Sequence, residues 1–272
     1  MTAATGLNIF QRLVRTWEAV QPYNAAQVLT VDSAIGPQTA QLAWESALAS
    51  LGLGRVRIDG RYLSHEVLNG DSSRYPVRVL ASRTNLATYL SDELNRPYDD
   101  PEEPPYRPFL INGDEISRLG VVYRHWVADS ISIRRVMQSW CEGIFSLPTT
   151  DPRALPAAPG YWDLFGPRNG QLRIDQTALD LFRSHMRFRR VQKVQSVDTS
   201  DHSVRVALTD FPDCVDRLRA HASSHSVTVG EILLAALCEA AVEFVPLQSR
   251  PRRKDIAVGN IVDLRPHSGR DL

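Results

Sequence analysis

The sequence predicts a layered fold of the α/β or α+β class, in which helices cover sheets. Segments with apolar residues at helical spacing alternate with short extended segments along most of the chain. The alternation lacks strict strand–helix–strand regularity, and no internal repeat or low-complexity tract interrupts it. The 272 residues, 43% hydrophobic and 23% charged, suffice for one large or two modest domains.

The first half of the chain shows this alternation most clearly. Apolar spacing over 9–20 predicts an amphipathic helix that ends near Pro22. Residues 97–108 are rich in proline and acidic residues and predict a loop, because proline fixes φ and lacks an amide donor. The remaining patterns predict strands at 26–31, 56–58, 62–68, 77–80, 109–111 and 119–123, and helices at 37–51, 86–94 and 131–145.

The second half begins with prolines that punctuate residues 146–170 without any periodicity, which predicts an interdomain connection. The helix over 229–244 is apolar nearly all round, so we expect it to be buried; Thr228 and Glu231 form a capping box at its start. The other patterns predict helices at 179–186 and 215–222, the latter with Pro212 in its first turn, and strands at 204–208 and 256–262. We therefore divide the chain into an N-terminal subdomain (1–150), a connection (151–175) and a C-terminal part (176–272).

Composition excludes several classes of function. Lys plus Arg and Asp plus Glu both total 31, so the zero net charge argues against a nucleic-acid partner. The three widely spaced cysteines, Cys141, Cys214 and Cys238, form no disulfide framework and have no metal-ligand spacing. The chain starts without a secretory signal pattern, and no apolar run reaches the roughly 20 residues of a membrane span. These features predict a cytoplasmic protein.

The stretch 121–130 carries the strongest functional signal. An apolar strand ends at His125, a short turn follows, and Asp129 or Ser130 caps the next helix. A side chain at the end of a rigid strand is well placed for catalysis, and a histidine, largely neutral at working pH, can accept a proton. The alternative interpretation is a hydrogen-bonded structural histidine followed by an ordinary N-capping aspartate.

Other polar residues predict no cofactor or metal site. His221 and His225 lie at i and i+4, but no carboxylate or cysteine is placed to complete a zinc site with them. Gly52-Leu53-Gly54 lacks the third glycine and the downstream acid of a dinucleotide-binding loop, and no Gly-x-Ser-x-Gly elbow is present. We expect no bound cofactor and no metal.

Three segments resemble the superfamily of condensation domains and chloramphenicol acetyltransferase, in the order of that superfamily. The first is the His125-x-x-x-Asp129 motif between its strand and its helix. The second is the helical segment 226–236, and the third is 261–266, which resembles the strand end that bears a structural arginine, here Arg265. The resemblance covers roughly residue 21 to the end of the chain.

The resemblance implies two sheet-and-helix subdomains around a central tunnel. His125 would be the general base of an HxxxD-type acyltransferase, and would accept a proton from a hydroxyl or amine acceptor that attacks an acyl thioester. The donor would be a coenzyme A or carrier-protein thioester, acting as a co-substrate. Asp129 would be structural and would pair with a cation, for which Arg265 is the matching candidate.

The sequence departs from the pattern of condensation domains at two positions. Many condensation domains have a second histidine before the catalytic one, where this chain has Arg124, and a glycine after the aspartate, where it has Ser130. Both changes favour a free-standing ester- or amide-forming enzyme.

The second subdomain of the superfamily continues past the segment that matches Arg265. We therefore expect it to be incomplete here, so that either a partner chain completes it or the chain is a truncated product that is inactive alone. The alternatives are a non-catalytic homologue that binds a carrier protein or a pantetheine arm, and an unrelated two-layer domain with a chance motif.

Overall fold

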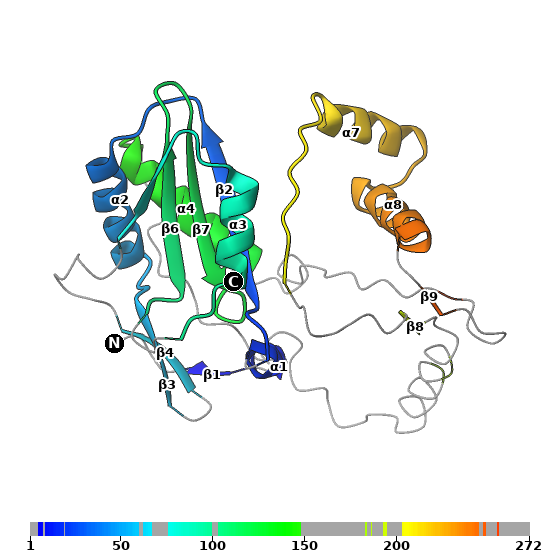
Figure 1. Ribbon diagram of the computed structural model, residues 1–272, viewed down its shortest axis with the longest axis horizontal. Coiled ribbons are helices and arrows are strands. Elements are labelled where there is room, and N and C mark those ends of the chain that lie inside the picture. The colour runs from blue at the N-terminus through cyan, green and yellow to red at the C-terminus, as the bar shows by residue number, and fades with distance from the viewer. Residues whose placement is uncertain are drawn as a thin grey trace. The chain divides into compact units, whose positions relative to one another are not determined.

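The computed structural model describes residues 5–7, 9–18, 20–59, 62–66, 76–99, 103–147, 193–194, 203–244 and 247–248, and the single positions 183, 186 and 255. The chain divides into two compact units. The first contains the described residues up to 147 together with 203–207, and the second contains the other described residues (Figure 1). Each unit is treated by itself below.

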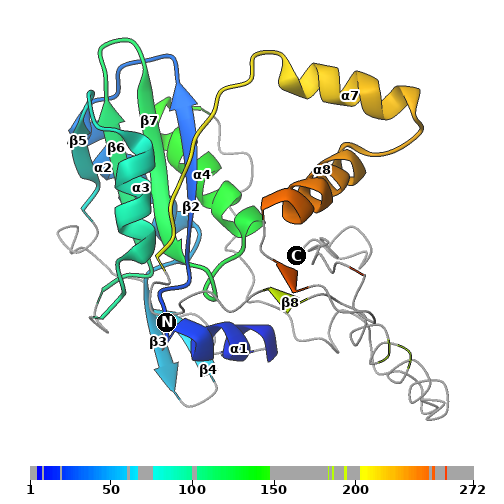
Figure 2. The ribbon, with the colours of Figure 1, turned by 45° about the vertical axis from the view of Figure 1, so that its right-hand side comes forward.

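The first unit is built on a four-stranded sheet with the order β2-β7-β6-β5 (Figures 1 and 2). Its strands are β2 (Asn24–Val31), β5 (Arg78–Ala81), β6 (Tyr106–Asn112) and β7 (Ser117–Arg124). β7 pairs antiparallel with β2 and with β6, and β5 pairs parallel with β6. The two central strands are buried almost continuously, as expected for strands with helices on both faces.

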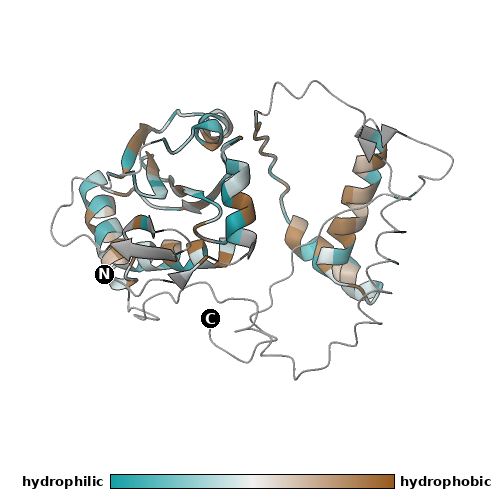
Figure 3. Ribbon diagram, turned by 90° about the horizontal axis from the view of Figure 1, so that it is seen from below, coloured by the Kyte–Doolittle hydropathy of each residue, from teal (hydrophilic) through white to brown (hydrophobic). Residues whose placement is uncertain are grey.

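Helices α2 (Pro37–Ser50) and α4 (Ser130–Ile144) pack on one face of this sheet. Their contact is centred on two buried indoles, Trp44 and Trp140, which meet edge to face with ring centroids 5.0 Å apart. The Nε1–H of Trp140 also donates to the carbonyl of Ala40, 2.8 Å away. In Figure 3 the helices carry hydrophilic and hydrophobic residues side by side, which is the amphipathic pattern that the sequence predicts for a sheet-covering layer.

Helix α3 (Leu86–Asn95) covers the opposite face. Its Tyr89 meets Phe109 of β6 edge to face at 4.8 Å. The register pairs Phe109 with Gly120 of β7, and a Cβ at Gly120 would lie 2.1 Å from the Phe109 ring. Glycine is therefore required at position 120 for the aromatic ring to lie flat across the strand.

A smaller sheet with the order β1-β4-β3 lies near helix α1 (Ile9–Glu18) (Figure 1). Its strands are β1 (Thr5–Gly6), β3 (Arg55–Asp59) and β4 (Tyr62–Glu66), paired antiparallel. Val14 of α1 forms a buried cluster with Leu7 and Trp126, so α1 packs against the segment that follows β7.

The described part of the second unit contains α7 (Cys214–Ser224), α8 (Val229–Phe244) and the short antiparallel strands β8 (Lys193–Val194) and β9 (Leu247–Gln248). The capping box at the start of α8 is confirmed: Thr228 Oγ1 accepts from the Glu231 amide at 3.2 Å, and Glu231 accepts from the Thr228 amide at 2.7 Å. No described helix is by itself long and apolar enough to cross a membrane; α7 and α8 reach that length and composition only when counted together, across a 99° bend.

Most of the predicted elements are confirmed within one to three residues, and four expectations need correction. The strand expected over 109–111 begins earlier, at Tyr106, and includes Pro108. Proline is tolerated there because pairing with β5 begins only at Phe109, so β6 is an edge strand at that point. Pro212 precedes the N-cap residue Asp213 of α7 and is therefore not in its first turn.

The other two corrections concern side-chain contacts. The segment expected as a strand over 204–208 is unpaired; side chains of α3 bind it instead, with Asn95 contacting the backbone of Val204 and Ser91 accepting from the Val206 amide. Helix α8 is not buried, since Leu233 and Leu237 are more than half exposed; its neighbour among the described elements is α7.

Some predictions lie outside the described residues. These are the connection 151–175, most of the strand 256–262, and Arg265. Of the predicted helix 179–186 the structure describes Arg183 and Met186, both helical. The three-part domain division and the central tunnel therefore stay predictions.

Candidate active site

The HxxxD motif occupies the junction between β7 and α4. β7 ends at Arg124, the amide of Val127 donates to the carbonyl of Arg124 at 3.0 Å to form a tight turn, and α4 begins at Ser130. The backbone amide of His125 donates to the carbonyl of Tyr23 at 3.1 Å, which extends the β2–β7 pairing by one step. His125 is thus anchored to the sheet through its backbone, as predicted for a residue at a strand end.

The imidazole of His125 lies between two tyrosine rings. It stacks on Tyr23 with centroids 5.6 Å apart and planes inclined by 16°, and it meets the edge of Tyr123 at 5.9 Å. Asn24 pairs with Arg124 in the β2–β7 register, so Tyr23 comes to lie opposite His125. Residues directly opposite each other on antiparallel strands bring their side chains together, which explains the stacking.

A hydrogen bond of 3.3 Å joins Nδ1 of His125 to the carbonyl oxygen of Ala128. A carbonyl oxygen can only accept, so Nδ1 carries the proton in this contact and Nε2 has the available lone pair. The side chain is half-buried. This arrangement can accept a proton at Nε2 while the motif's own backbone holds the other nitrogen.

Asp129 is the N-cap residue of α4. Its extended backbone (φ −92°, ψ 175°) turns the carboxylate toward the first helical turn, where it accepts from the Ser132 amide at 2.8 Å. This contact selects Asp129 over Ser130 as the cap. An ordinary helix start would show the same cap, so the contact does not by itself separate the two interpretations of the motif.

Tyr123 links the motif to the strand before it. Burial and, to a smaller extent, the negative charge of Asp129 raise the pKa of Tyr123 to about 12, while a hydrogen bond with Gln27 opposes the shift. Its phenol is therefore neutral at physiological pH. Gln27 in turn donates to the carbonyl of Ser130, at 2.5 Å, so β2 also holds the start of α4.

Arg124, the residue before His125, binds the end of α1. Its guanidinium donates to both carboxylate oxygens of Glu18, at 3.0 and 2.6 Å. The indole Nε1–H of Trp126 donates to the same carboxylate at 2.8 Å. The residues on either side of His125 are therefore both bound to the last residue of α1.

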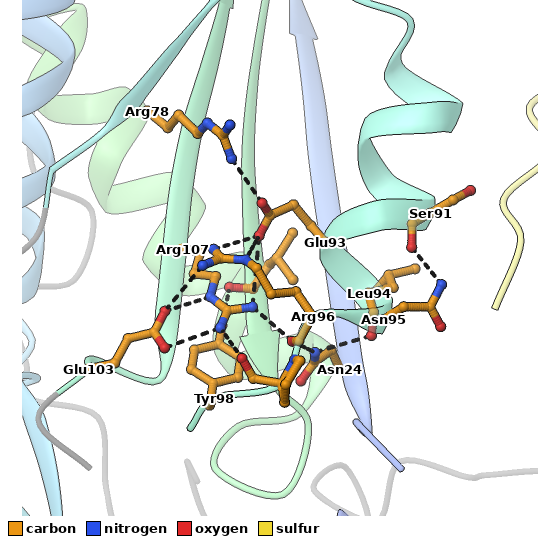
Figure 4. Close-up of polar contacts among 12 residues, drawn as sticks. Asn24, Arg78, Ser91, Glu93, Leu94, Asn95, Arg96, Tyr98, Glu103 and Arg107 are labelled. Atoms are coloured by element: carbon orange, nitrogen blue, oxygen red, sulfur yellow. Dashed lines mark hydrogen bonds and ion pairs between the residues drawn. The ribbon is translucent and has the colours of Figure 1, made fainter. Parts of the chain in front are cut away.

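A buried charge network lies against the strand that leads to His125 (Figure 4). Arg107, 7% exposed, donates to both oxygens of Glu103 and to the carbonyls of Arg96 and Pro97, and its guanidinium stacks 3.6 Å above the ring of Tyr98. The hydroxyl of Tyr98 donates to the carbonyl of Val122 in β7 at 3.1 Å.

Glu93, also buried, forms ion pairs with Arg78, Arg96 and Arg107 in the same network (Figure 4). The proline- and acid-rich loop predicted over 97–108 is thus fixed to the sheet by charges at both of its ends. Sequence reasoning missed this network, as it missed Glu18, Tyr23 and Trp126, because single charged or aromatic residues carry no periodic signal.

No cluster of potential metal ligands is found in the part of the chain that the structure describes. No three His, Cys, Asp or Glu side chains gather there. His221 and His225 do face one way on α7, with ring centroids 4.4 Å apart, but no further ligand joins them among those residues. All three cysteines are free thiols, and burial raises the pKa of the Cys141 thiol.

Of the three predicted site residues, the structure brings two together. His125 and Asp129 lie on one turn, as their spacing requires. Arg265 lies outside the described residues, so its pairing with Asp129 stays a prediction.

Comparisons with known proteins place the fold. The sequence matches no protein-family model and no curated protein. Solved structures do match. The first condensation domain of the calcium-dependent antibiotic synthetase, in complex with a substrate analogue, has a TM-score of 0.60 at 14% identity, over 87% of this chain and 60% of its own.

Two further matches agree with it. The EpoB cyclization-docking bidomain from Sorangium cellulosum has a TM-score of 0.57 at 14% identity, over 89% of this chain and 52% of its own. The condensation domain of the monacolin K polyketide synthase MokA has a TM-score of 0.51 at 13% identity, over 86% of this chain and 58% of its own. The chain spans only about half to three fifths of these structures. The chain has the mixed α/β fold of the condensation domains.

Proposed function

We propose that the protein is an acyltransferase of the condensation-domain type, which transfers an acyl group from a thioester to a hydroxyl or amine. In this proposal His125 is the general base. The observation that carries the proposal is the state of the His125 ring. It lies at the end of a central strand, is half-buried, and has its Nδ1 bound to Ala128, which leaves Nε2 to accept a proton. The solved structures that share this fold include a condensation domain and a cyclization domain.

The proton and bond changes balance on one imidazole. Nε2 of His125 removes the proton of the acceptor hydroxyl or amine as its oxygen or nitrogen attacks the thioester carbonyl. The tetrahedral intermediate then collapses, the carbon–sulfur bond breaks, and the imidazolium returns its proton to the leaving thiolate. The Nδ1–H bond to Ala128 persists through the cycle, because Nδ1 never has to give up its proton.

The donor that we propose is a thioester on coenzyme A or on the pantetheine arm of a carrier protein, and the acceptor is a small molecule. Both act as substrates, and no resident cofactor is needed. In this proposal Asp129 shapes the motif by capping α4 and by pairing with Arg265.

The test is thiol release from two defined donors, acetyl-coenzyme A and an acetylated carrier protein, each with a panel of amine and alcohol acceptors. We expect acceptor-dependent release with the wild-type chain, and a loss of roughly 10²–10⁴-fold in His125→Ala. His221→Ala, a matched histidine substitution on the exposed surface of α7, should keep the wild-type rate.

Two outcomes would count against the proposal. Equal rates for His125→Ala and the wild type would remove His125 from the chemistry. Binding of the carrier protein or of pantetheine without any turnover would favour the alternative, a non-catalytic domain that docks the thioester arm.

A further inference from the structure

We propose that Glu18 is a positioning residue: by binding the side chains on both sides of His125, it fixes the orientation of the imidazole toward the substrate. The inference rests on the proposed function for its catalytic consequence. The contacts that support it belong to the structure alone, and they join the end of α1 to a motif more than a hundred residues further along the chain.

The first support is the geometry of the carboxylate. One oxygen of Glu18 accepts from Nε of Arg124 at 3.0 Å, and the other accepts from both Arg124 and the Trp126 indole, at 2.6 and 2.8 Å. A two-pronged pairing between a guanidinium and a carboxylate fixes both distance and plane. Since His125 is the residue between Arg124 and Trp126, its backbone can rotate little while both neighbours are held.

The second support is burial. The indole of Trp126 is 2% exposed and packs with Val14 and Leu7, and the backbone carbonyl of Trp126 accepts from the Gln11 side chain. The side chain of Glu18 is itself only 11% exposed. Ionic contacts with little solvent around them are screened less than surface pairs, so this one can hold a geometry.

The third support is a local conflict in the sequence. Glu18 is the last residue of α1, where the partial negative charge of the helix end disfavours an acid. The contacts with Arg124 and Trp126 offset that cost. The charge of Glu18 is unfavourable at the end of α1 and is compensated by donors from the motif segment. Local conflicts of this kind are expected at functional sites.

The consequence for His125 is the stacking on Tyr23. The ring reaches Tyr23 only if the backbone at 125 keeps its present orientation, which is fixed by the hydrogen bond to the Tyr23 carbonyl and by the neighbours on either side. Arg124 in this chain therefore acts through Glu18, where many condensation domains have a second histidine.

The experiment is NMR on the full chain with labelled histidine and tryptophan side chains. His125→Asn assigns the His125 ring signals, and Trp126→Phe assigns the indole N–H signal. Glu18→Gln keeps the shape of the side chain and removes its charge. We expect this variant to shift the Trp126 indole signal, to shift the ring signals of His125, and to weaken the nuclear Overhauser contact between His125 and Tyr23.

Arg124→Lys is the second variant. This variant keeps the positive charge but cannot donate to both oxygens of Glu18 as the guanidinium does, so it should give the same changes in the signals to a smaller extent. It replaces Glu18→Gln in the experiment if that variant does not fold. Asp216→Asn makes the same carboxylate-to-amide change in the exposed Arg219–Asp216 pair and should leave the His125 signals unchanged.

The inference is overturned if the Trp126 indole signal shifts in Glu18→Gln while the His125 ring signals stay at their wild-type positions, because the contact would then be lost without moving the ring. An unchanged indole signal would overturn it as well, by showing that Glu18 does not hold Trp126. These readouts do not depend on turnover, so they separate failure of the inference from failure of the acyl-transfer proposal.

With transfer activity in hand, a positioning role predicts a fall in kcat of roughly 10–100-fold in Glu18→Gln, with KM changed little. A rise in KM at constant kcat would contradict it.

Discussion

The ring of Tyr23 stacks on the imidazole of His125, with centroids 5.6 Å apart and planes 16° from parallel. The contact follows from the β2–β7 register, which brings Tyr23 opposite His125 at the open end of the ladder. It holds one face of the His125 imidazole against a flat aromatic ring.

This stacking predicts a difference between two substitutions of Tyr23. Tyr23→Phe keeps the ring and should keep most of the transfer rate. Tyr23→Leu removes the flat surface, so the imidazole becomes less well oriented, and we expect kcat to fall by roughly tenfold. Steady-state thiol release on both variants checks this; equal rates for Phe and Leu would show that the ring does not orient His125.

His125→Asn should abolish transfer without unfolding the protein. The side chain is half-buried and its hydrogen bond to Ala128 is long, so little folding energy depends on it. We expect a thermal midpoint within about 2–4 °C of the wild type, which corresponds to roughly 1 kcal/mol for a chain of this size. A larger fall would identify His125 as a structural histidine, in agreement with the alternative interpretation of the motif.

Two substitutions of Asp129, to alanine and to asparagine, separate its role as a helix cap from the role of its charge. Asparagine caps helices about as well as aspartate, whereas alanine does not. The cap contact with the Ser132 amide accounts for about 1 kcal/mol, which Asp129→Ala removes and Asp129→Asn retains; the proposed pairing with Arg265 adds a loss of stability that we expect in both variants.

Chemical denaturation measures both. Similar losses in Asp129→Ala and Asp129→Asn would show that the charge matters more than the cap, as the proposed pairing with Arg265 requires.

Arg107→Lys tests the buried network shown in Figure 4. Lysine keeps the charge but cannot donate at once to Glu103 and to the carbonyls of Arg96 and Pro97. A buried acceptor left without a donor costs about 1–3 kcal/mol, so the free energy of unfolding should fall by at least that amount. Asp216→Asn, in an exposed pair, should change it by less than about 0.5 kcal/mol; similar losses in the two variants would contradict the role of burial.

Tyrosine titration should destabilise the protein at high pH. Burial raises the pKa of both Tyr89 and Tyr123 from 10.0 to about 12. A folded-state pKa above the unfolded value means that the stabilisation is fully present below pH 10 and is lost as the pH rises from 10 toward 12, because the unfolded chain releases these protons first. Denaturation at pH 9, 10 and 11, with tyrosinate absorbance followed in parallel, checks this; constant stability over the range would contradict it.

Much of the first unit was predictable because its signals are local. The apolar spacing of 37–51, 86–94 and 131–145 matches α2, α3 and α4 closely. The two helix caps depend on residues three positions apart. The capping box of Thr228 and Glu231 formed as predicted, and the cap of α4 is Asp129, one of the two predicted candidates.

Three of the four errors share one cause, since each depended on a neighbour distant in sequence; the fourth, at Pro212, is a local shift of the helix start. Pro108 is accommodated in β6 because of where β5 begins to pair, and the segment near Val204 is bound by side chains of α3 instead of by a strand. The hydropathy of α8 predicts burial, yet burial depends on which elements surround the helix.

Residues a few positions apart encode periodicity and helix caps, so the alternation of helices and strands and the position of His125 at a strand end could be read from the sequence. The resemblance to condensation domains was also visible there, and the fold agrees with it. The side chains that surround the imidazole became known from the folded chain. Glu18 meets Arg124, and Tyr23 meets His125, through strand register and helix packing. The residues in these contacts are close in space but about a hundred positions apart in the sequence, so no local sequence pattern predicts them.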